Sequence, residues 1–248
     1  MDQIELKKKG LCIITTCNNK KEALKTTINS IDRQIQQPDM HIVVCKNMNN
    51  YDLSVFKKKN RIFIINKDKS LYHAMNIGLN NNNFSHVLFL NSEDKLFNNL
   101  CLLNVKKYLN LKKTIVLKTI LKNKNHYFYP KKNLFSKKNY LPHSSFIGYL
   151  DNNSKKKKFL LNEKVKADGI WMSEIIKKKK TLFVNLYLTV HKLGGISSEP
   201  GYSKIFMYNN TFEILKQIIK FFISLFLSKE LYYKIIYYYK YSREYKFF

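Results

Sequence analysis

The chain has 248 residues, which is enough to bury one sizeable core and favours one domain, or a domain with an appendage. Hydrophobic residues make up 45% of it, a normal share for a globular protein, so we do not expect wholesale disorder. The formal net charge of +28 favours an anionic partner such as nucleic acid or acidic lipid.

Strand and helix patterns alternate through the first 90 residues. A β-branched apolar run at 11–16 predicts a strand, and apolar positions at helical spacing within 23–31 predict a helix after it. The same patterns then predict strands at 41–45, 61–65 and 86–90 and a helix at 71–79. Apolar strands that alternate with helices indicate a parallel sheet covered on both faces, so the expected fold class is α/β.

Polar residues directly after each strand are the first candidates for a site, because open parallel sheets bind ligands beyond the carboxyl ends of their strands. The strand at 86–90 runs into Asn-Ser-Glu-Asp at 91–94. Two carboxylates at the end of a buried strand would be costly without a partner, and a divalent cation would compensate them. The alternative is an N-cap and an acidic first turn for a helix that begins near Leu96.

The stretch from Asp68 to Gly78 resembles the signature of glycosyltransferase family 2, Asp-x-Gly-(Ile/Leu)-Tyr-Asp-Ala-Met-Asn-Lys-Gly. In that family the signature precedes a strand that ends Leu-Asn-Ser-Asp-Asp, and here the strand ends Leu-Asn-Ser-Glu-Asp at 90–94. Further similarities, in the expected order, lie at 13–18, 30–34, 142–143, 167–168 and 194–197. The resemblance covers roughly residues 10–200 and implies a GT-A fold, a Rossmann-like, mainly parallel sheet with helices on both faces.

Several positions depart from the family pattern. Ser70, His73, Ile77 and Glu93 stand where the signature and the acidic pair have Gly, Asp, Lys and Asp. The segment at 46–50 lacks the Asp-rich, Gly-containing turn that relatives usually carry there. The resemblance therefore implies nothing about the donor base or sugar.

The resemblance implies a metal site at the acidic pair. Asp94 is the expected ligand of Mn²⁺ or Mg²⁺, which would stabilise the charge that develops on the diphosphate leaving group. Glu93 is expected to help hold the ribose or a metal-bound water.

The same resemblance implies a nucleotide pocket. Asp68 is the candidate for contacting the base or ribose, with Thr15 and Cys17 lining the pocket and Asn76 on one side of it. Asp68 could instead, or as well, cap the helix that starts near Leu71. Tyr72 lies one turn from Asn76 and would line the same side of the pocket, although packing in the core accounts for Tyr72 equally well.

Inversion at the anomeric carbon requires a general base, and Asp168 is the best candidate. A helix cap is the alternative for Asp168, and Glu174 is the reserve base.

Trp171, the only Trp, is expected either to form a platform for a sugar or to pack in the core. His143 and His191 stand where relatives have acceptor-side or phosphate-side residues, although a lone His is more often structural. Gly194 and Gly195 are expected in a loop over the diphosphate.

The composition changes near residue 206, which divides the chain into a catalytic domain at 1–205 and a tail at 206–248. Charges at Lys220, Lys229 and Glu230 interrupt the apolar stretch of the tail, so it is too short to span a bilayer. The mixed aromatics and lysines at 232–240 are typical of an interfacial segment. We expect an amphipathic helical tail on an anionic membrane surface, with packing against the catalytic domain as the alternative.

The cysteines and the first residues favour the cytoplasm. Cys12, Cys17, Cys45 and Cys101 form no Cys-x-x-Cys pair and have no His at zinc-finger spacing, so neither a zinc site nor a disulfide framework is indicated. The first residues lack the order of a signal peptide. We therefore expect a cytoplasmic protein, peripheral at the inner face of the cell membrane.

The resemblance implies an inverting, metal-dependent glycosyltransferase. It would move a sugar from a nucleotide-sugar to a glycan or lipid-linked acceptor in bacterial surface polysaccharide biosynthesis, of capsule or lipopolysaccharide type. As the donor we expect a UDP-sugar, an expectation that does not come from the family motifs. One alternative is a basic nucleic-acid-binding protein, although the lysines are scattered and no nucleic-acid-binding motif is recognisable. The other is a nucleotidyltransferase, which would need a Gly-rich loop where 15–21 has no Gly.

Overall fold

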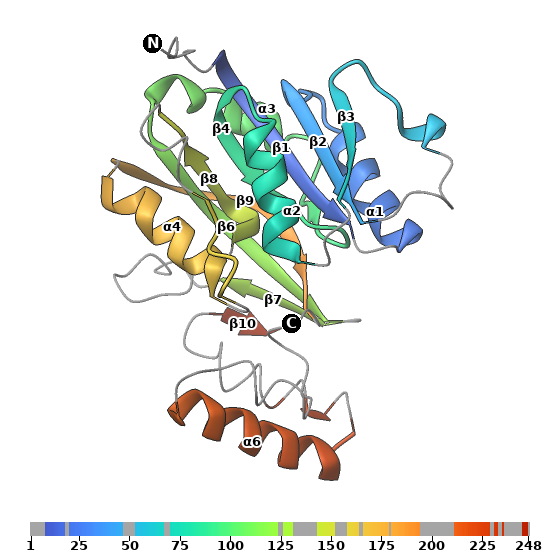
Figure 1. The fold of residues 1–248 in the computed structure, drawn as a ribbon, viewed down its shortest axis with the longest axis vertical. Coiled ribbons are helices and arrows are strands. Elements are labelled where there is room, and N and C mark those ends of the chain that lie inside the picture. The colour runs from blue at the N-terminus through green and yellow to red at the C-terminus, as the bar shows by residue number, and fades with distance from the viewer. Residues whose placement is uncertain are drawn as a thin grey trace.

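A computed structural model of the chain confirms the α/β prediction (Figure 1). It describes residues 8–17, 20–46, 53–66, 70–123, 126–130, 143–151, 158–163, 166–178, 180–193, 211–228, 231–232, 235 and 245–247. Asp68, Gly194 and Gly195 lie outside these residues, and so does most of the interfacial segment predicted at 232–240.

The first half of the chain forms the parallel part of the sheet. The strands lie in the order β3-β2-β1-β4, and every pair among them is parallel. They are β1 (Lys8–Cys17), β2 (Met40–Cys45), β3 (Arg61–Ile65) and β4 (Phe84–Phe89), connected by α1 (Lys21–Asp32), the 3₁₀ turn Ser54–Phe56 and α2 (Leu71–Asn80). All four predicted strands and both predicted helices are present.

The second half extends the sheet with strands of both directions. β8 (Phe146–Tyr149) is antiparallel to β4 and to β6 (Thr114–Asn123), and β7 (His126–Pro130) is antiparallel to β6. The long strand β9 (Thr181–Lys192) runs parallel to β6. This half also contains α3 (Cys101–Lys106), α4 (Ala167–Lys178) and 3₁₀ turns at Leu109–Leu111 and His143–Ser145.

The helix expected near Leu96 does not begin there. Lys95 and Leu96 form the short strand β5 (Lys95–Leu96), which pairs antiparallel with β9, and the next helix begins at Cys101. An N-cap is therefore wrong for 92–94. Cross-strand pairing with β9 overrides the local preference of acidic residues for a helix start.

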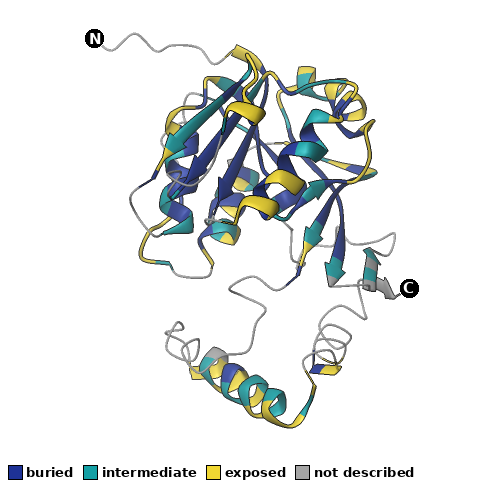
Figure 2. Cartoon of the chain, turned by 90° about the vertical axis from the view of Figure 1, so that its right-hand side faces the viewer, coloured by how far each residue is buried: buried dark blue, intermediate teal, exposed yellow. Residues whose placement is uncertain are grey.

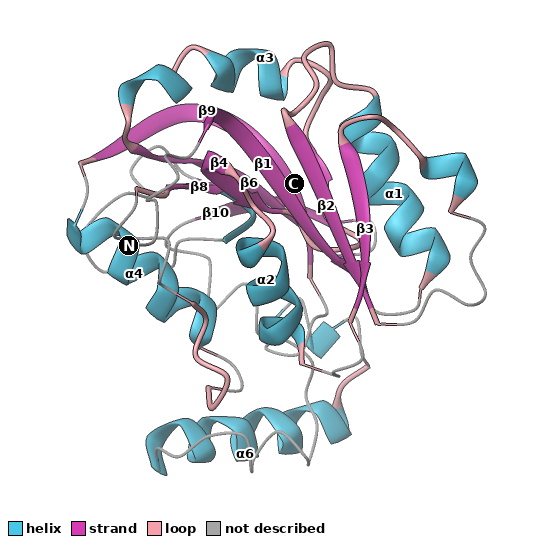
Figure 3. Cartoon of the chain, turned by 45° about the horizontal axis from the view of Figure 1, so that its top comes forward, coloured by secondary structure: helices cyan, strands magenta, loops and turns pink. Residues whose placement is uncertain are grey.

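The sheet is the middle of three layers (Figure 3). α2 and α4 cover one face, and their core includes Ile14, Met75 and Trp171. α1 and α3 cover the other face over apolar clusters that include Ile13 and Ile28. The strands between the two layers are mostly buried (Figure 2).

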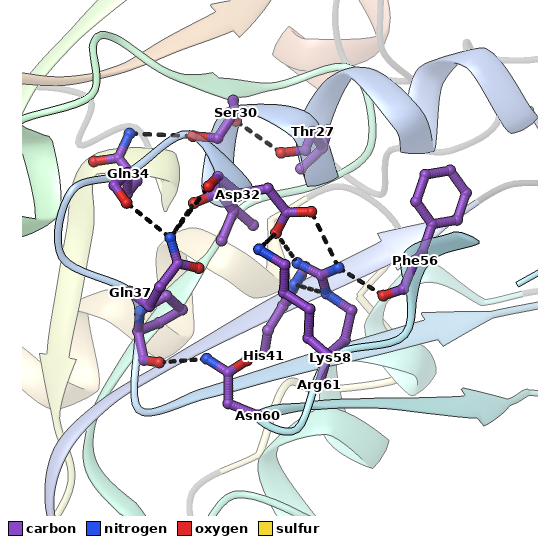
Figure 4. A network of polar contacts seen from close by, with 12 residues as sticks. Thr27, Ser30, Asp32, Gln34, Gln37, His41, Phe56, Lys58, Asn60 and Arg61 are labelled. Carbon is purple, nitrogen blue, oxygen red and sulfur yellow. Dashed lines mark hydrogen bonds and ion pairs between the residues drawn. The ribbon is translucent and has the colours of Figure 1, made fainter. Parts of the chain in front are cut away.

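A partly buried polar network ties α1 to β2 and β3 (Figure 4). The guanidinium of Arg61 forms an ion pair with Asp32 at the end of α1, and Lys58 lies 2.9 Å from the same carboxylate. Arg61 also donates to the carbonyl of Phe56 at 2.7 Å and, through Nε, to Nδ1 of His41 at 2.8 Å. Burial, then the charges of Arg61 and Lys58, lower the pKa of His41 well below its ordinary value, so this imidazole is neutral.

The tail contributes a helix and a strand. α6 (Thr211–Phe226) lies apart from the three layers in Figures 1 and 3, and none of the helices in the described ranges is long and apolar enough to cross a bilayer. β10 (Tyr245–Phe247) pairs antiparallel with β7 at the edge of the sheet. The last residues of the predicted tail therefore belong to the sheet of the predicted catalytic domain.

Candidate active site

Asp94 and His191 meet at the carboxyl end of β4. Asp94 is 3% exposed, and its carboxylate lies 3.0 Å from Nδ1 of His191 and accepts the backbone N–H of Lys192 at 2.9 Å. The pairing of β5 with β9 brings these residues together. Thr27 of α1 fixes the turn from the other side, since its hydroxyl donates to the carbonyls of Asn91 and Asp94 at 3.2 and 2.7 Å.

Glu93 adopts an unusual backbone conformation beside this pair. Its φ of +80° lies in the left-handed region, which costs free energy for a residue with a Cβ and recurs at functional sites. Its carboxylate forms an ion pair with Lys192, with a distance of 2.8 Å from Oε1 to Nζ. The predicted ribose or water contact of Glu93 stays a prediction.

Asp168 and His143 form a second pair at the same edge of the sheet. Asp168 lies in the first turn of α4, where Oδ1 accepts the N–H of Gly169 at 2.8 Å and Oδ2 lies 3.4 Å from Nδ1 of His143. Burial raises the pKa of Asp168, but the hydrogen bond from His143 and the N–H of Gly169 outweigh it, so the net pKa is lowered. The carboxylate is therefore ionised at neutral pH. Burial, followed by the charge of Asp168, raises the pKa of the nearby Tyr72.

Asn91 connects the second pair to the end of β1. The hydroxyl of Thr16 donates to Asn91 Oδ1 at 2.7 Å, and Asn91 Nδ2 lies 3.1 Å from Nε2 of His143. The rings of His143 and His191 are in edge-to-face contact, with centroids 5.8 Å apart. Asp168, His143, His191 and Asp94 thus form one continuous cluster drawn from four separate segments.

Thr15 and Cys17 do not point to the face of the sheet on which the Asp168 cluster lies, but to the other face. Thr15 is fully buried and its Oγ1 lies 2.9 Å from Nε2 of His41, while Cys17 packs with Leu24 and Cys45 beneath α1. Side chains alternate along a strand, so Thr16 is the residue of β1 that reaches the Asp168 cluster. Sequence reasoning missed Thr16 and gave Asn91 no role, although strand alternation could have identified Thr16.

Asn76 holds a neighbouring loop through its side chain. Its amide donates to the carbonyl of Phe159 at 2.9 Å and accepts the N–H of Phe159 at 2.8 Å. Phe159 in turn stacks on Trp171, with ring centroids 5.0 Å apart. Trp171 is 3% exposed, so the structure favours its core role over a sugar platform. Glu174, the reserve base, lies on α4 paired with Lys177.

The donor atoms of Asp94 and His191 fit a divalent cation. Among the described residues, no group of three or more His, Cys, Asp or Glu side chains could hold a metal ion. The carboxylate of Asp94 and Nδ1 of His191 lie 3.0 Å apart, which is a hydrogen-bond distance and is also about the spacing of neighbouring ligands on an octahedral ion with bonds of about 2.1 Å. Mg²⁺ usually keeps waters and substrate phosphates around one or two protein ligands, and a carboxylate such as that of Asp94 suits both Mg²⁺ and Mn²⁺.

Known proteins were compared with the chain by sequence and by structure. No protein-family model matches it, and no curated protein sequence matches it significantly. Solved structures of S. aureus TarS, a GT-A type glycosyltransferase, are similar to it. TarS 1–349 in complex with UDP-GlcNAc has a TM-score of 0.64 at 15% identity, covering 84% of this chain and 66% of that one.

Two further TarS structures agree with this result. TarS 1–349 in complex with UDP has a TM-score of 0.60 at 14% identity, covering 74% of this chain and 60% of that one. The longer TarS structure has a TM-score of 0.58 at 13% identity, covering 86% of this chain and 43% of that one. The chain thus spans less than two thirds of the TarS chains, and at this identity the likeness concerns the fold alone. The chain has the fold of a GT-A type glycosyltransferase.

Proposed function

We propose that the chain is a metal-dependent, inverting glycosyltransferase that uses a nucleotide-sugar donor. The observation that carries this proposal is the meeting of Asp94 and His191 with Asp168 and His143 at one edge of a GT-A sheet. One pair suits a cation and the other presents an ionised carboxylate. The TarS complexes with UDP and UDP-GlcNAc support a UDP-sugar as donor.

Asp94 and His191 would hold Mn²⁺ or Mg²⁺ on the diphosphate side of the site. The bound ion would neutralise the negative charge that develops on the departing nucleoside diphosphate. Lys192, whose Nζ pairs with Glu93 at this edge, places a further positive charge near the same side. Thr27 and the β5–β9 pairing preorganise the ligands, so little reorganisation is needed when the donor binds.

Asp168 is the general base in this proposal. Its carboxylate would accept the proton of the acceptor hydroxyl while that oxygen attacks the anomeric carbon from the side opposite the diphosphate, which inverts the configuration. The lowered pKa keeps Asp168 ionised, and Tyr72 remains a neutral phenol next to it.

We further propose that the acceptor is a lipid-linked bacterial surface glycan and that the tail holds the protein at the inner face of the cell membrane. The support is α6, which exposes a face of large apolar side chains with Lys216 close by, its Nζ 4.4 Å from the ring centroid of Phe212. Helices that bind the interface combine such an apolar face with lysines. The exposed residues are Phe212, Leu215, Ile219, Phe222, Leu225 and Phe226.

Thermal unfolding with a panel of nucleotide-sugars tests the proposed activity, because a ligand that binds only the folded state raises its stability. We expect at least one UDP-sugar to raise the Tm when Mn²⁺ is present and to have no such effect with a chelator. Stabilisation by nucleic acid alone, weakening steeply with salt, would instead favour a nucleic-acid-binding protein.

A further inference from the structure

We propose that His143 is a positioning residue for the general base, which it orients as a neutral imidazole whose tautomer is set by Asn91. The inference rests on the proposed function in one respect, the role of Asp168 as base. It assigns to His143 a different role from the acceptor-side contact that the sequence suggests.

The hydrogen-bond donors between Thr16, Asn91 and His143 can be assigned in turn, starting at Thr16. The hydroxyl of Thr16 donates to Oδ1 of Asn91 at 2.7 Å, which leaves the amide nitrogen of Asn91 to face His143. An amide nitrogen can only donate, so Nε2 of His143, 3.1 Å away, must be the acceptor. A neutral imidazole that accepts at Nε2 carries its proton on Nδ1, and Nδ1 is the atom that faces Asp168.

The two oxygens of Asp168 therefore have different partners. Oδ1 accepts the backbone N–H of Gly169 at 2.8 Å, and Oδ2 lies 3.4 Å from Nδ1 of His143. That separation is longer than an ordinary hydrogen bond, and such contacts tighten when a substrate binds. With one oxygen held by the helix and the other facing the imidazole, the carboxylate has a fixed plane.

The surroundings of His143 are connected by a backbone hydrogen bond and by a ring contact. The backbone N–H of Ser92 donates to the carbonyl of Thr16 at 3.0 Å, so the ends of β1 and β4 are joined beneath Asn91. His143 begins the 3₁₀ turn before β8, and its ring packs edge-to-face against His191. Loss of the imidazole would leave the ionised Asp168 without its side-chain donor, and a base that rotates away from the acceptor hydroxyl costs turnover rather than donor affinity.

Substitutions at His143 separate positioning from mere packing. His143→Leu removes the donor and keeps an apolar side chain of similar size, whereas His143→Asn returns an N–H₂ donor close to the position of Nδ1. The matched control is His86→Leu, which removes a buried histidine at the opposite end of β4. The assay is Mn²⁺-dependent turnover of UDP-GlcNAc, with water as acceptor where no glycan is supplied, and with UDP affinity measured by calorimetry.

We expect His143→Leu to lower kcat at least ~10-fold at unchanged UDP affinity and donor KM, because misplacement of a reacting group acts on turnover. His143→Asn should recover most of that loss, and His86→Leu should keep the parent kcat per folded molecule. Equal losses in His143→Leu and His143→Asn, or a parallel rise in donor KM, would overturn the positioning role.

Nitrogen NMR of histidine-labelled protein tests the same inference without any activity. We expect His143 to carry its proton on Nδ1 in the parent and to lose that preference in Asn91→Leu, with the tautomer of His86 unchanged. A parent His143 with its proton on Nε2 would overturn the proposal. If the parent turned over no nucleotide-sugar, the proposed function would fail by itself, and the tautomer would still decide the geometry.

Discussion

Asp168 experiences two opposing effects on its carboxyl group. Burial disfavours the charged form, while His143 and the N–H of Gly169 favour it, and the lowered pKa shows which effect is larger. A base that is ionised throughout the neutral range needs no deprotonation step before it can accept a proton. If Asp168 is the base, as proposed, the contacts of both its oxygens would offset its weaker proton affinity by placing it for the transfer.

Replacing Asp168 by Asn should leave Mn²⁺-dependent UDP binding nearly unchanged and lower turnover by at least ~10²-fold, the usual loss when a general base is removed. Steady-state kinetics and calorimetry on the same preparation measure the two effects. Glu174→Gln on the same helix is the control, because Glu174 lies further along α4 and its carboxylate pairs with Lys177. A large loss in Glu174→Gln with little in Asp168→Asn would make Glu174 the base.

Single residues could be predicted where the family motif fixes their position. They could not be predicted where the outcome depends on which face of the sheet a strand residue points to. Asp94 and Asp168 were chosen by resemblance, and the fold brings both to one edge. The resemblance points to Thr15, yet the side chain that reaches Asn91 is that of Thr16. Asn76 could not be predicted as a partner of Phe159, because 83 residues separate the two and only the folded chain joins them.

At the scale of elements, α2 and β1 pack so closely at Gly78 that there is no room for a side chain at this position. A Cβ added at Gly78 would lie 2.4 Å from Cγ2 of Ile14, so only Gly fits at this position of α2. The helix spans Leu71–Asn80, and the end of the family-like signature thus serves packing rather than ligand contact.

Gly78→Ala should lower the free energy of unfolding by about 1–3 kcal/mol, since overpacking outweighs the gain in helix propensity. Urea unfolding measures the change. Gly169→Ala on α4 is the matched control, because a Cβ there meets nothing within 4 Å, and it should raise stability by up to about 1 kcal/mol. Equal effects at the two positions would contradict the close α2–β1 contact.

Two buried histidines on the parallel strands, His41 and His86, make the stability of the fold sensitive to acid. Burial lowers the pKa of His86 to about 4, and burial and two cations lower the pKa of His41. Between an unfolded pKa of about 6.5 and the lower folded value, the unfolded chain binds more protons, so stability falls as the pH falls through this window.

We therefore expect the free energy of unfolding to decrease between about pH 6.5 and pH 4, by about 3 kcal/mol from His86 alone. Urea titrations at a series of pH values measure it. The slope should be smaller in His86→Leu than in the parent. An equal slope in both proteins would mean that His86 titrates in the folded state as it does in the unfolded chain.

Elements were predictable where local pattern and sheet packing agree. The strands predicted at 41–45 and 61–65 are apolar after their first residue, and the structure has them within one residue of the predicted bounds. The turn at 92–94 could not be read locally, because pairing with β9, nearly a hundred residues later, makes Lys95 and Leu96 a strand.

At the scale of the whole molecule, α6 stands out because it lies apart from the three layers of the fold. Its exposed apolar face predicts binding to vesicles with acidic headgroups, while β10 of the same tail pairs with β7 and excludes a simple deletion as a test. Point substitutions on α6 avoid disturbing the sheet.

Phe222→Ser with Phe226→Ser should reduce co-sedimentation with anionic vesicles and leave the Tm unchanged, because both side chains are exposed. High salt should weaken parent binding without abolishing it, since attraction of lysines is screened and apolar burial is not. Unchanged vesicle binding, or a lower Tm in the double variant, would indicate that this face of α6 packs against the protein instead.

The central claim is that residues from distant parts of the chain form one metal-dependent nucleotide-sugar site. Calorimetry of UDP binding with and without Mn²⁺, on the parent and on Asp94→Asn, tests it most directly. We predict binding to the parent only when Mn²⁺ is present, and no metal-dependent binding to Asp94→Asn at an unchanged Tm. UDP affinity that is the same in both proteins, or independent of Mn²⁺ in the parent, would contradict the account.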